Sequence, residues 1–155
     1  MTEQITIRKA IANDLAKLIE FEQEIITAER PFDSTLKPTK ISYYDLSKMI
    51  DATDVQIVVA EKGLELIGSG YARIVTAKPY LNHENYAYLG FMYTHPNHRG
   101  KGINASIIKE LQNWCALQNI FEIRLDVYHE NGPAIKAYEK AGFKKHLVNM
   151  RLASY

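Results

Sequence analysis

The chain has a single cysteine, no long apolar run and almost no net charge, and each of these shortages excludes a class of protein. Cys115 stands alone, so an internal disulfide is excluded. No apolar run approaches the ~20 residues of a membrane-spanning helix, and the opening letters MTEQITIRKA lack the apolar centre of a secretion signal. The net charge of +1 gives no general attraction to nucleic acid or to a membrane surface. We therefore expect a cytoplasmic protein without nucleic-acid or membrane partners, in which any anion site is local.

The length and the apolar patterning indicate one ordinary globular domain. A chain of 155 residues, 46% of them hydrophobic, suits a single domain over positions 1–155. Alternating apolar residues predict strands, and apolar residues at a period of 3.6 predict helices. The expected strands cover residues 5–10, 55–63, 65–77, 84–94, 120–128 and 143–154, and the expected helices cover 13–26, 43–51, 103–119 and 131–142. This order predicts a mixed α/β or α+β fold around one sheet.

The stretch HPNHRGKGIN, residues 95–104, lies between an expected strand and an expected helix. Gly100 and Gly102 allow the backbone to approach a ligand closely, and Arg99 and Lys101 add positive charge. The first N–H groups of a helix have no partner inside the helix and attract anions. The stretch therefore predicts a phosphate or pyrophosphate site, although a plain surface turn would use the same residue types.

Two common phosphate-binding motifs fit this stretch less well. A P-loop ends in Gly-Lys-Ser/Thr, whereas Lys101 is followed by Gly102 and Ile103. The letters GKGINA match the dinucleotide fingerprint G-x-G-x-x-A, and Asp126 follows about twenty residues later. That fingerprint leaves its strand almost directly, whereas THPNHR intervenes here, and the chain after Ala105 is too short for the remaining strands of that fold.

A third motif gives a more specific match. The letters YTHPNHRGKGIN, the strand letters IRLDV and the helix letters NGPAIKAYEKAGF together resemble the GNAT superfamily of acyl-coenzyme A dependent N-acyltransferases. The match extends from Tyr88 to the region of Leu152. The resemblance implies a single GNAT-like domain with a central, mostly antiparallel mixed sheet, splayed fourth and fifth strands, and helices on both faces. It also implies acetyl-coenzyme A as co-substrate, without a metal ion.

In that family the coenzyme lies in the gap between the splayed strands. The resemblance implies that the backbone of Met92, Tyr93 and Thr94 pairs with the pantetheine arm, and that Lys140 contacts the nucleotide end. It implies that backbone N–H groups hold the pyrophosphate at Arg99, Gly100, Lys101, Gly102, Ile103 and Asn104. Relatives usually have Gly or Ala where this chain has Asn104. We expect coenzyme binding to survive this departure, because most of the donors are backbone groups at other positions.

The helix block adds three residues to the expected site. Asn131 stands at a helix N-terminus, where its side chain can cap the helix or reach a ligand amide. Ala134 and Tyr138 lie four residues apart and so share one helical face. A tyrosine of ordinary pKa, about 10, is protonated at neutral pH and can donate to a leaving thiolate. We expect Tyr138 to be the general acid; the alternative is a core tyrosine that packs the helix against the sheet.

A base is also needed, because an alkyl ammonium of pKa ~10.4 is protonated at neutral pH and only the neutral amine attacks. Many relatives carry a glutamate on the fourth strand, where this chain has Gly90 and Phe91. Glu22, on the otherwise apolar face of the first helix, and Asp126, on the fifth strand, are candidates for this role. Each can equally be a carboxylate that reaches solvent.

Together these features predict an N-acetyltransferase. It would transfer the acetyl group of acetyl-coenzyme A to a primary amine of a small molecule or peptide. The resemblance to the family implies direct attack by the amine, with the oxyanion held by a backbone N–H of the fourth strand. The alternative is a non-catalytic domain that binds acyl-coenzyme A as a sensor or interaction module. The sequence identifies neither the acceptor nor the oligomeric state; relatives are often dimers, and a homodimer is compatible with the sequence.

Overall fold

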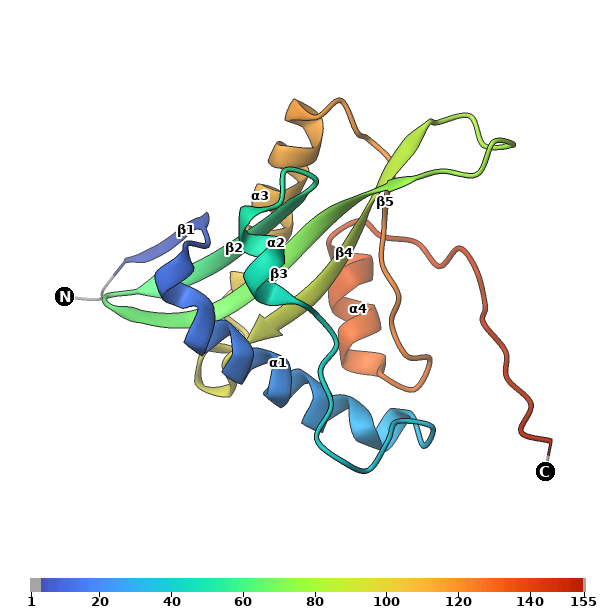
Figure 1. Cartoon of the computed structure of the whole chain (residues 1–155), viewed down its shortest axis with the longest axis horizontal. Coiled ribbons are helices and arrows are strands. Elements are labelled where there is room, and N and C mark those ends of the chain that lie inside the picture. Colours follow the sequence, from blue (N-terminus) through green and yellow to red (C-terminus); the bar gives the residue numbers. More distant parts are fainter. Residues whose placement is uncertain (1–3, 155) are drawn as a thin grey trace.

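The computed structural model describes residues 4–154, and its elements follow the expected order as far as the last helix (Figure 1). The strands are β1 (Ile5–Lys9), β2 (Val55–Lys62), β3 (Glu65–Thr76), β4 (Asn85–Thr94) and β5 (Ile123–Arg124). The helices are α1 (Leu15–Glu29), α2 (Leu46–Asp51), α3 (Ile103–Leu117) and α4 (Gly132–Lys140), with 3-10 turns η1 (Ala12–Asp14), η2 (Arg30–Phe32) and η3 (Pro96–His98). The single domain expected over positions 1–155 includes residues 1–3 and 155, which lie outside the described residues, and it stays a prediction.

The strands form one mixed sheet in the order β1-β2-β3-β4-β5. The first four strands are antiparallel to their neighbours, and β5 is parallel to β4. β2 and β3 form a hairpin whose turn contains Gly63 at a positive φ of 62°. A parallel pair needs a crossover connection, which α3 supplies. The α+β fold class expected from the sequence is thus confirmed.

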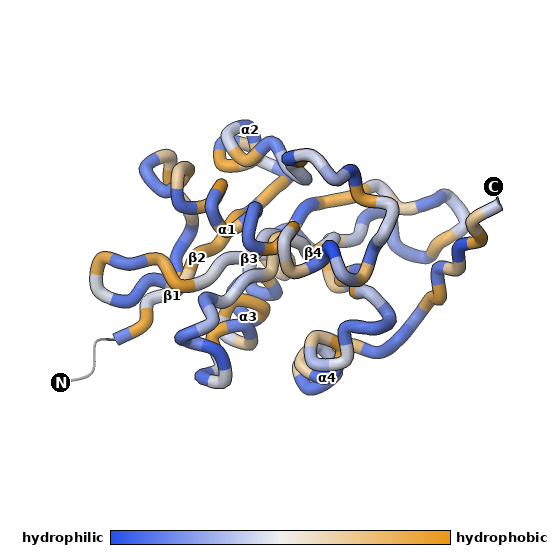
Figure 2. Tube along the Cα trace, turned by 90° about the horizontal axis from the view of Figure 1, so that it is seen from below, coloured by the Kyte–Doolittle hydropathy of each residue, from blue (hydrophilic) through white to orange (hydrophobic). Residues whose placement is uncertain are grey.

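Helices cover both faces of the sheet, as Figure 2 shows with α1 and α2 on one side and α3 and α4 on the other. α1 packs through Leu18, which is fully buried in a cluster that includes Tyr71 of β3. α3 packs through Ile107 and Leu111, both fully buried in a cluster that includes Ala72 of β3. Successive residues of a strand point to opposite faces, which explains this division. No helix within residues 4–154 combines the length and apolar character needed to cross a membrane.

β4 is the strand around which the candidate site forms. It pairs with β3 from one end to the other, but it pairs with β5 only at Ala87 and Tyr88. Beyond Tyr88 the two strands part, as the resemblance implied. Within residues 4–154, the outer edge of β4 is therefore without a strand partner over its second half.

A β-bulge follows the point where the strands part. The register of β4 on β3 shifts so that Phe91 and Met92 lie opposite Gly70 alone. Phe91 takes a positive φ of 57°, which is costly for a bulky side chain and persists only where the surroundings enforce it. The buried hydroxyl of Ser69 donates to the Phe91 carbonyl at 3.0 Å and so fixes this backbone. The irregularity thus falls directly after Gly90.

Two expectations about the C-terminal half are wrong. β5 is limited to two residues, because only Ile123 and Arg124 reach β4. Residues 143–154 form no strand, because the short β5 offers little edge to pair with, and this segment runs away from the sheet (Figure 1). Its apolar side chains stay exposed at Leu147, Val148, Met150 and Leu152.

An ion pair ties the start of α1 to β1. Asp14 occupies the N-cap position of α1, but its carboxylate makes no capping hydrogen bond. Instead it accepts two hydrogen bonds from the Arg8 guanidinium, at 2.9 and 3.0 Å, and one from the Ile11 N–H at 2.8 Å. Arg8 also donates to Glu61 at 2.9 Å. The Arg8 guanidinium lowers the pKa of the Asp14 carboxyl below its usual value, although burial opposes this shift.

We expect the Asp14→Asn variant to be less stable than the parent protein by about 1–3 kcal/mol at neutral pH, because it loses charge-assisted hydrogen bonds. A carboxylate whose pKa is lowered by folding stabilises the fold above its unfolded pKa of about 3.9, and loses this effect as the pH falls through the folded pKa. Urea unfolding of both proteins across this range measures the difference. It should shrink in acid; a difference independent of pH would contradict the assignment.

Candidate active site

The loop between η3 and α3 presents a row of backbone donors. Gly100 and Gly102 both have a φ of 78°, a conformation that glycine adopts without strain. A Cβ at either position would meet nothing within 4 Å, so these glycines serve the backbone conformation and the space above them is open. Within the described residues, no backbone carbonyl accepts from the N–H groups between Gly100 and Ala105. Such donors, together with the dipole of α3, suit an anion.

The side chains of this loop have separate tasks. Arg99 Nε donates to the Thr94 carbonyl at 3.3 Å and so ties the loop to the end of β4. Lys101 is exposed beside the row of donors. Ile103 is 3% exposed and packs in the core under α3, so its N–H is the group that it can offer to a ligand. Asn104 follows on the first turn of α3 and is half-buried.

β4 offers an unpaired strand edge next to this loop. The side chain of Tyr93 points to α1, where its hydroxyl donates to Glu24 and its ring centroid lies 4.4 Å from that of Phe21. The side chain of Met92 packs on the opposite face with the α3 cluster. Thr94 is the last β4 residue paired with β3. The side chains of this stretch are thus engaged elsewhere, and its outer backbone edge is available to an extended chain.

α4 brings Asn131, Ala134 and Tyr138 together. Asn131 Oδ1 accepts from the Ala134 N–H at 3.3 Å, which confirms the expected helix cap. The ring of Tyr138 lies edge-on to Phe143, with 5.8 Å between centroids and 74° between planes. Burial, and then the charge of Glu29, raises the pKa of Tyr138 to about 12. Its hydroxyl is therefore protonated at neutral pH, as a proton donor must be.

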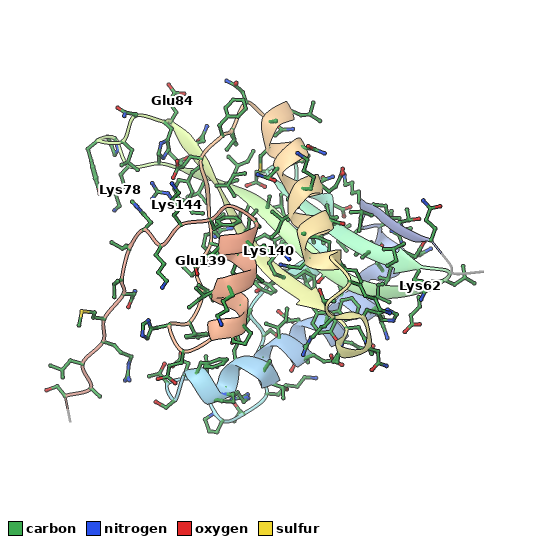
Figure 3. All side chains as sticks on the ribbon, turned by 180° about the vertical axis from the view of Figure 1, so that it is seen from behind. Lys62, Lys78, Glu84, Glu139, Lys140 and Lys144 are labelled. Atoms are coloured by element: carbon green, nitrogen blue, oxygen red, sulfur yellow. The ribbon has the colours of Figure 1, made fainter. Side chains whose placement is uncertain are left out.

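Lys140 lies at the end of α4, and His95 and His98 lie at the two ends of the 3-10 turn before the loop of donors. Figure 3 shows Lys140 at the last turn of α4, with Glu139 beside it. His95 Nδ1 accepts from the Asn97 N–H at 3.1 Å, which makes His95 a turn residue. Its ring centroid lies 5.8 Å from that of His98. In the part of the chain that the structure describes, no three side chains of the metal-binding types lie together.

Glu22 anchors the loop between α1 and α2. It lies on the apolar face of α1, as the sequence placed it, and is 2% exposed. Its Oε2 accepts from the N–H groups of Tyr43 at 2.9 Å and Tyr44 at 2.7 Å. Gln23 adds a hydrogen bond from Nε2 to the Ile41 carbonyl at 2.9 Å. Charge-assisted bonds to backbone N–H groups are strong, so the loop and its two tyrosines are held to α1.

Asp126 lies where β4 and β5 part. It is exposed, two residues beyond β5, and accepts from the Tyr88 hydroxyl at 3.0 Å. Tyr88 belongs to the last pair of the two strands, opposite Arg124, and the Arg73 guanidinium lies 5.5 Å from its ring centroid. Burial, and then the charge of Asp126, raises the pKa of Tyr88. The two carboxylates expected to act as bases thus lie apart, with Glu22 under the loop and Asp126 beside the gap.

Glu29 is a residue that the sequence analysis misses. It is the last residue of α1, it is half-buried, and burial raises the pKa of its carboxyl. Its charge raises the pKa of tyrosines from the loop, the β5 exit and α4, namely Tyr43, Tyr44, Tyr128 and Tyr138. The Tyr43 hydroxyl is covered and has no hydrogen-bond partner of good geometry within residues 4–154. A glutamate at a helix end is typically exposed, so the sequence carries no signal for this position.

The chain after β5 is also tied to the loop after α1. The Tyr128 hydroxyl donates to Asp33 at 2.9 Å, and its ring stacks on Phe32 with 5.9 Å between centroids. The loop after α1 and the chain after β5, which are 95 residues apart at Asp33 and Tyr128, therefore meet beside Glu29. The result is a group of aromatic hydroxyls and carboxylates on the α1 side of the gap, opposite the loop of backbone donors.

This chain is similar to one known protein family and to several solved structures. Residues 19–143 match the acetyltransferase (GNAT) family. No curated protein sequence matches the chain. A mutant protein from Bacillus halodurans matches with a TM-score of 0.87 at 16% identity, over 97% of this chain and 99% of that one. A predicted acetyltransferase from Clostridium acetobutylicum, solved with acetyl-CoA, matches with a TM-score of 0.71 at 21% identity, over 97% and 96%. Glucosamine-6-phosphate N-acetyltransferase from Arabidopsis thaliana matches with a TM-score of 0.71 at 20% identity, over 97% and 99%.

At these identities the solved structures establish the fold, and the family match establishes the kind of enzyme. The match begins inside α1 and ends just beyond α4, so it includes the parted strands, the loop of donors and the α4 residues. Enzymes of this family use acetyl-coenzyme A and acetylate amines. The chain belongs to the acetyltransferase (GNAT) family of N-acetyltransferases.

Proposed function

We propose that this chain transfers an acetyl group from acetyl-coenzyme A to a primary amine of a small molecule or a peptide. The observation that carries the proposal is the row of N–H groups from Gly100 to Ala105, which have no backbone acceptor in the part of the chain that the structure describes, with Arg99 and Lys101 beside it. A pyrophosphate offers the charged acceptors that such donors bind most strongly.

The residues present fit this coenzyme. In the proposal, residues 99–104 hold the pyrophosphate, the edge at 92–94 pairs with the pantetheine amides, and Lys140 contacts the nucleotide end. Asn131 and Ala134 line the thioester end next to Tyr138. The coenzyme supplies an acetyl group activated as a thioester. The open space above the loop glycines supports this placement, because no protein side chain fills it.

The chain's own groups would manage the protons and the developing charge. The amine nitrogen bonds to the acetyl carbon, the carbon–sulfur bond breaks, and the leaving thiolate takes the proton of the Tyr138 hydroxyl. The protonated amine gives one proton to the base before it attacks, and the proton that the nitrogen loses as the amide forms returns to the Tyr138 oxygen. A backbone N–H of β4 near the bulge stabilises the oxyanion, an effect that is usually large.

Three carboxylates compete for the proton of the amine, and we favour Glu29. Glu22 already accepts two backbone N–H groups, and Asp126 already accepts the Tyr88 hydroxyl. Glu29 combines partial burial with a raised pKa, and its charge reaches Tyr138. A carboxylate of raised pKa is a better general base, because its affinity for a proton is closer to that of the amine.

Coenzyme binding is tested by thermal unfolding. Coenzyme A or acetyl-coenzyme A at about 100 times its Kd should add about 2.7 kcal/mol of stability, which raises Tm by several degrees. NAD at the same concentration should leave Tm unchanged. Lys101→Ala should reduce the shift, whereas Lys109→Ala, an exposed lysine further along α3, should not. A shift with NAD alone, or no shift with coenzyme A, would contradict the proposal.

We expect Tyr138→Phe to lower kcat by about 10²-fold or more, because the leaving thiolate loses its proton donor. The Tm shift caused by coenzyme A should be unchanged, since the ring is kept. Thiol release from acetyl-coenzyme A measures the rate, with Tyr80→Phe, an exposed tyrosine in the β3–β4 turn, as the matched control. If Tyr138→Phe keeps the parent rate, the hydroxyl is not the acid.

The choice among the carboxylates is tested by Glu29→Gln, Glu22→Gln and Asp126→Asn. Each amide can still accept a hydrogen bond, so structural roles are largely kept while the base is lost. We expect Glu29→Gln to lower kcat/KM by about 10²-fold. A base acts when deprotonated, so the parent profile should show an acidic limb above the ordinary glutamate value of about 4.3; Glu29→Gln should lose this limb and keep only the rise due to deprotonation of the amine itself. Loss confined to Glu22→Gln or Asp126→Asn would move the role to that residue.

A further inference from the structure

A tyrosine from β3 fills the place on β4 where many relatives carry a glutamate. Gly90 pairs directly with Tyr71 in the β3–β4 register. A Cβ at Gly90 would lie 2.5 Å from both Cζ and Oη of Tyr71, which is closer than non-bonded atoms can approach. Gly90 is not among the glycines with positive φ, so its backbone alone does not require glycine. The side chain that β4 lacks is therefore excluded by the tyrosine beside it.

The Tyr71 ring is held firmly in this position. It is 4% exposed, and Tyr44 packs against it edge-on with 5.4 Å between centroids and 87° between planes. Tyr44 also packs edge-on against Phe91, at 5.5 Å and 68°. The backbone of Tyr44 is in turn fixed by Glu22 of α1. The hydroxyl of Tyr71 thus keeps a defined place over Gly90.

That place is where an acceptor has to meet the acetyl group. Gly90 lies two residues beyond Tyr88, the last β4 residue that pairs with β5, and one residue before the bulge at Phe91. Residues two apart share a face of a strand, so Tyr88 and Gly90 lie on the α1 side. The Tyr71 hydroxyl therefore stands beside the parting strands, on the side of Glu29 and the loop tyrosines.

We propose that Tyr71 orients the acceptor amine, its Oη accepting a hydrogen bond from the amine N–H at the place that the β4 glutamate has in relatives. The inference rests on the proposed function. A phenolic oxygen has lone pairs for such a bond, and one N–H engaged in this way leaves the nitrogen lone pair free to attack. Tyr71 keeps its own proton throughout, and the proton that the amine loses goes to the separate base. Burial raises the pKa of Tyr71, although the Arg73 guanidinium beside it opposes this shift, and the net direction fits a hydroxyl that stays neutral.

The first test removes only the oxygen. Tyr71→Phe keeps the ring between Tyr44 and Gly90, so stability and the Tm shift with coenzyme A should be unchanged. We expect kcat/KM for the amine to fall about threefold to tenfold, the effect of one neutral hydrogen bond. The probe is the best acceptor among spermidine, glucosamine 6-phosphate, kanamycin and a lysine peptide, followed by thiol release. Tyr80→Phe is the control.

The second test moves the polar group from β3 to β4. Tyr71→Ala frees the space over Gly90, and adding Gly90→Glu places a carboxylate there. We expect the double variant to be at least tenfold more active than Tyr71→Ala alone, with a new acidic limb in its pH profile, because the transplanted group titrates. Tyr71→Phe should show no such change in the shape of the profile. This readout separates orientation of the amine from simple packing.

The outcomes distinguish this inference from the proposed function. If the parent protein neither binds coenzyme A nor acetylates any amine of the panel, the proposed function fails and the inference falls with it. If the parent is active and Tyr71→Phe keeps its kcat/KM, the inference alone is overturned. If Tyr71→Phe loses activity together with the coenzyme-induced Tm shift, the tyrosine supports the coenzyme side and the inference is again overturned.

Discussion

The bulge at Phe91 is the constraint from which the candidate site follows. β4 is bound to β3 on one edge throughout, while its other edge loses β5 after Tyr88. A strand with one free edge could simply twist away, but the hydrogen bond from Ser69 to the Phe91 carbonyl fixes the backbone at this point. The strain of a positive φ at Phe91 is compensated by the packing of its ring, which is 2% exposed. The free backbone groups beyond the bulge therefore have fixed directions.

The two faces of β4 serve different ends of the reaction that we propose. On the side of α3, the loop of backbone donors and the α4 residues suit an anionic coenzyme. On the side of α1, aromatic hydroxyls and carboxylates gather around the same bulge. Glu22 accepts the backbone N–H groups of Tyr43 and Tyr44 and so holds them in place. The ring of Tyr44 then packs edge-on against the rings of Tyr71 and Phe91 and restricts them. A buried carboxylate that would be costly alone is satisfied here by two backbone donors, and its role is positional.

Local features were predictable from the sequence, and non-local ones were not. The loop glycines, the Asn131 cap and the helix from Ile103 depend on residues within a few positions of one another, so the sequence pattern sufficed. The length of β5 depends on the number of its residues that lie close enough to β4 to form hydrogen bonds. The alternation of Ile123, Leu125 and Val127 carries no information about that distance. The same limit applies to residues 143–154, whose apolar pattern is that of a strand but which find no edge to join.

The candidate site needed the structure for a related reason. From the sequence, Gly90 is only the absence of a base, and Tyr71 is one apolar residue of a strand. Their register makes them one unit, in which the tyrosine ring excludes any side chain at position 90 and puts a neutral hydroxyl there instead. With no charge at this point of β4, the carboxylate that accepts the proton has to lie elsewhere. In the mechanism that we propose this carboxylate is Glu29, across the group of tyrosines, whose pKa is raised by burial.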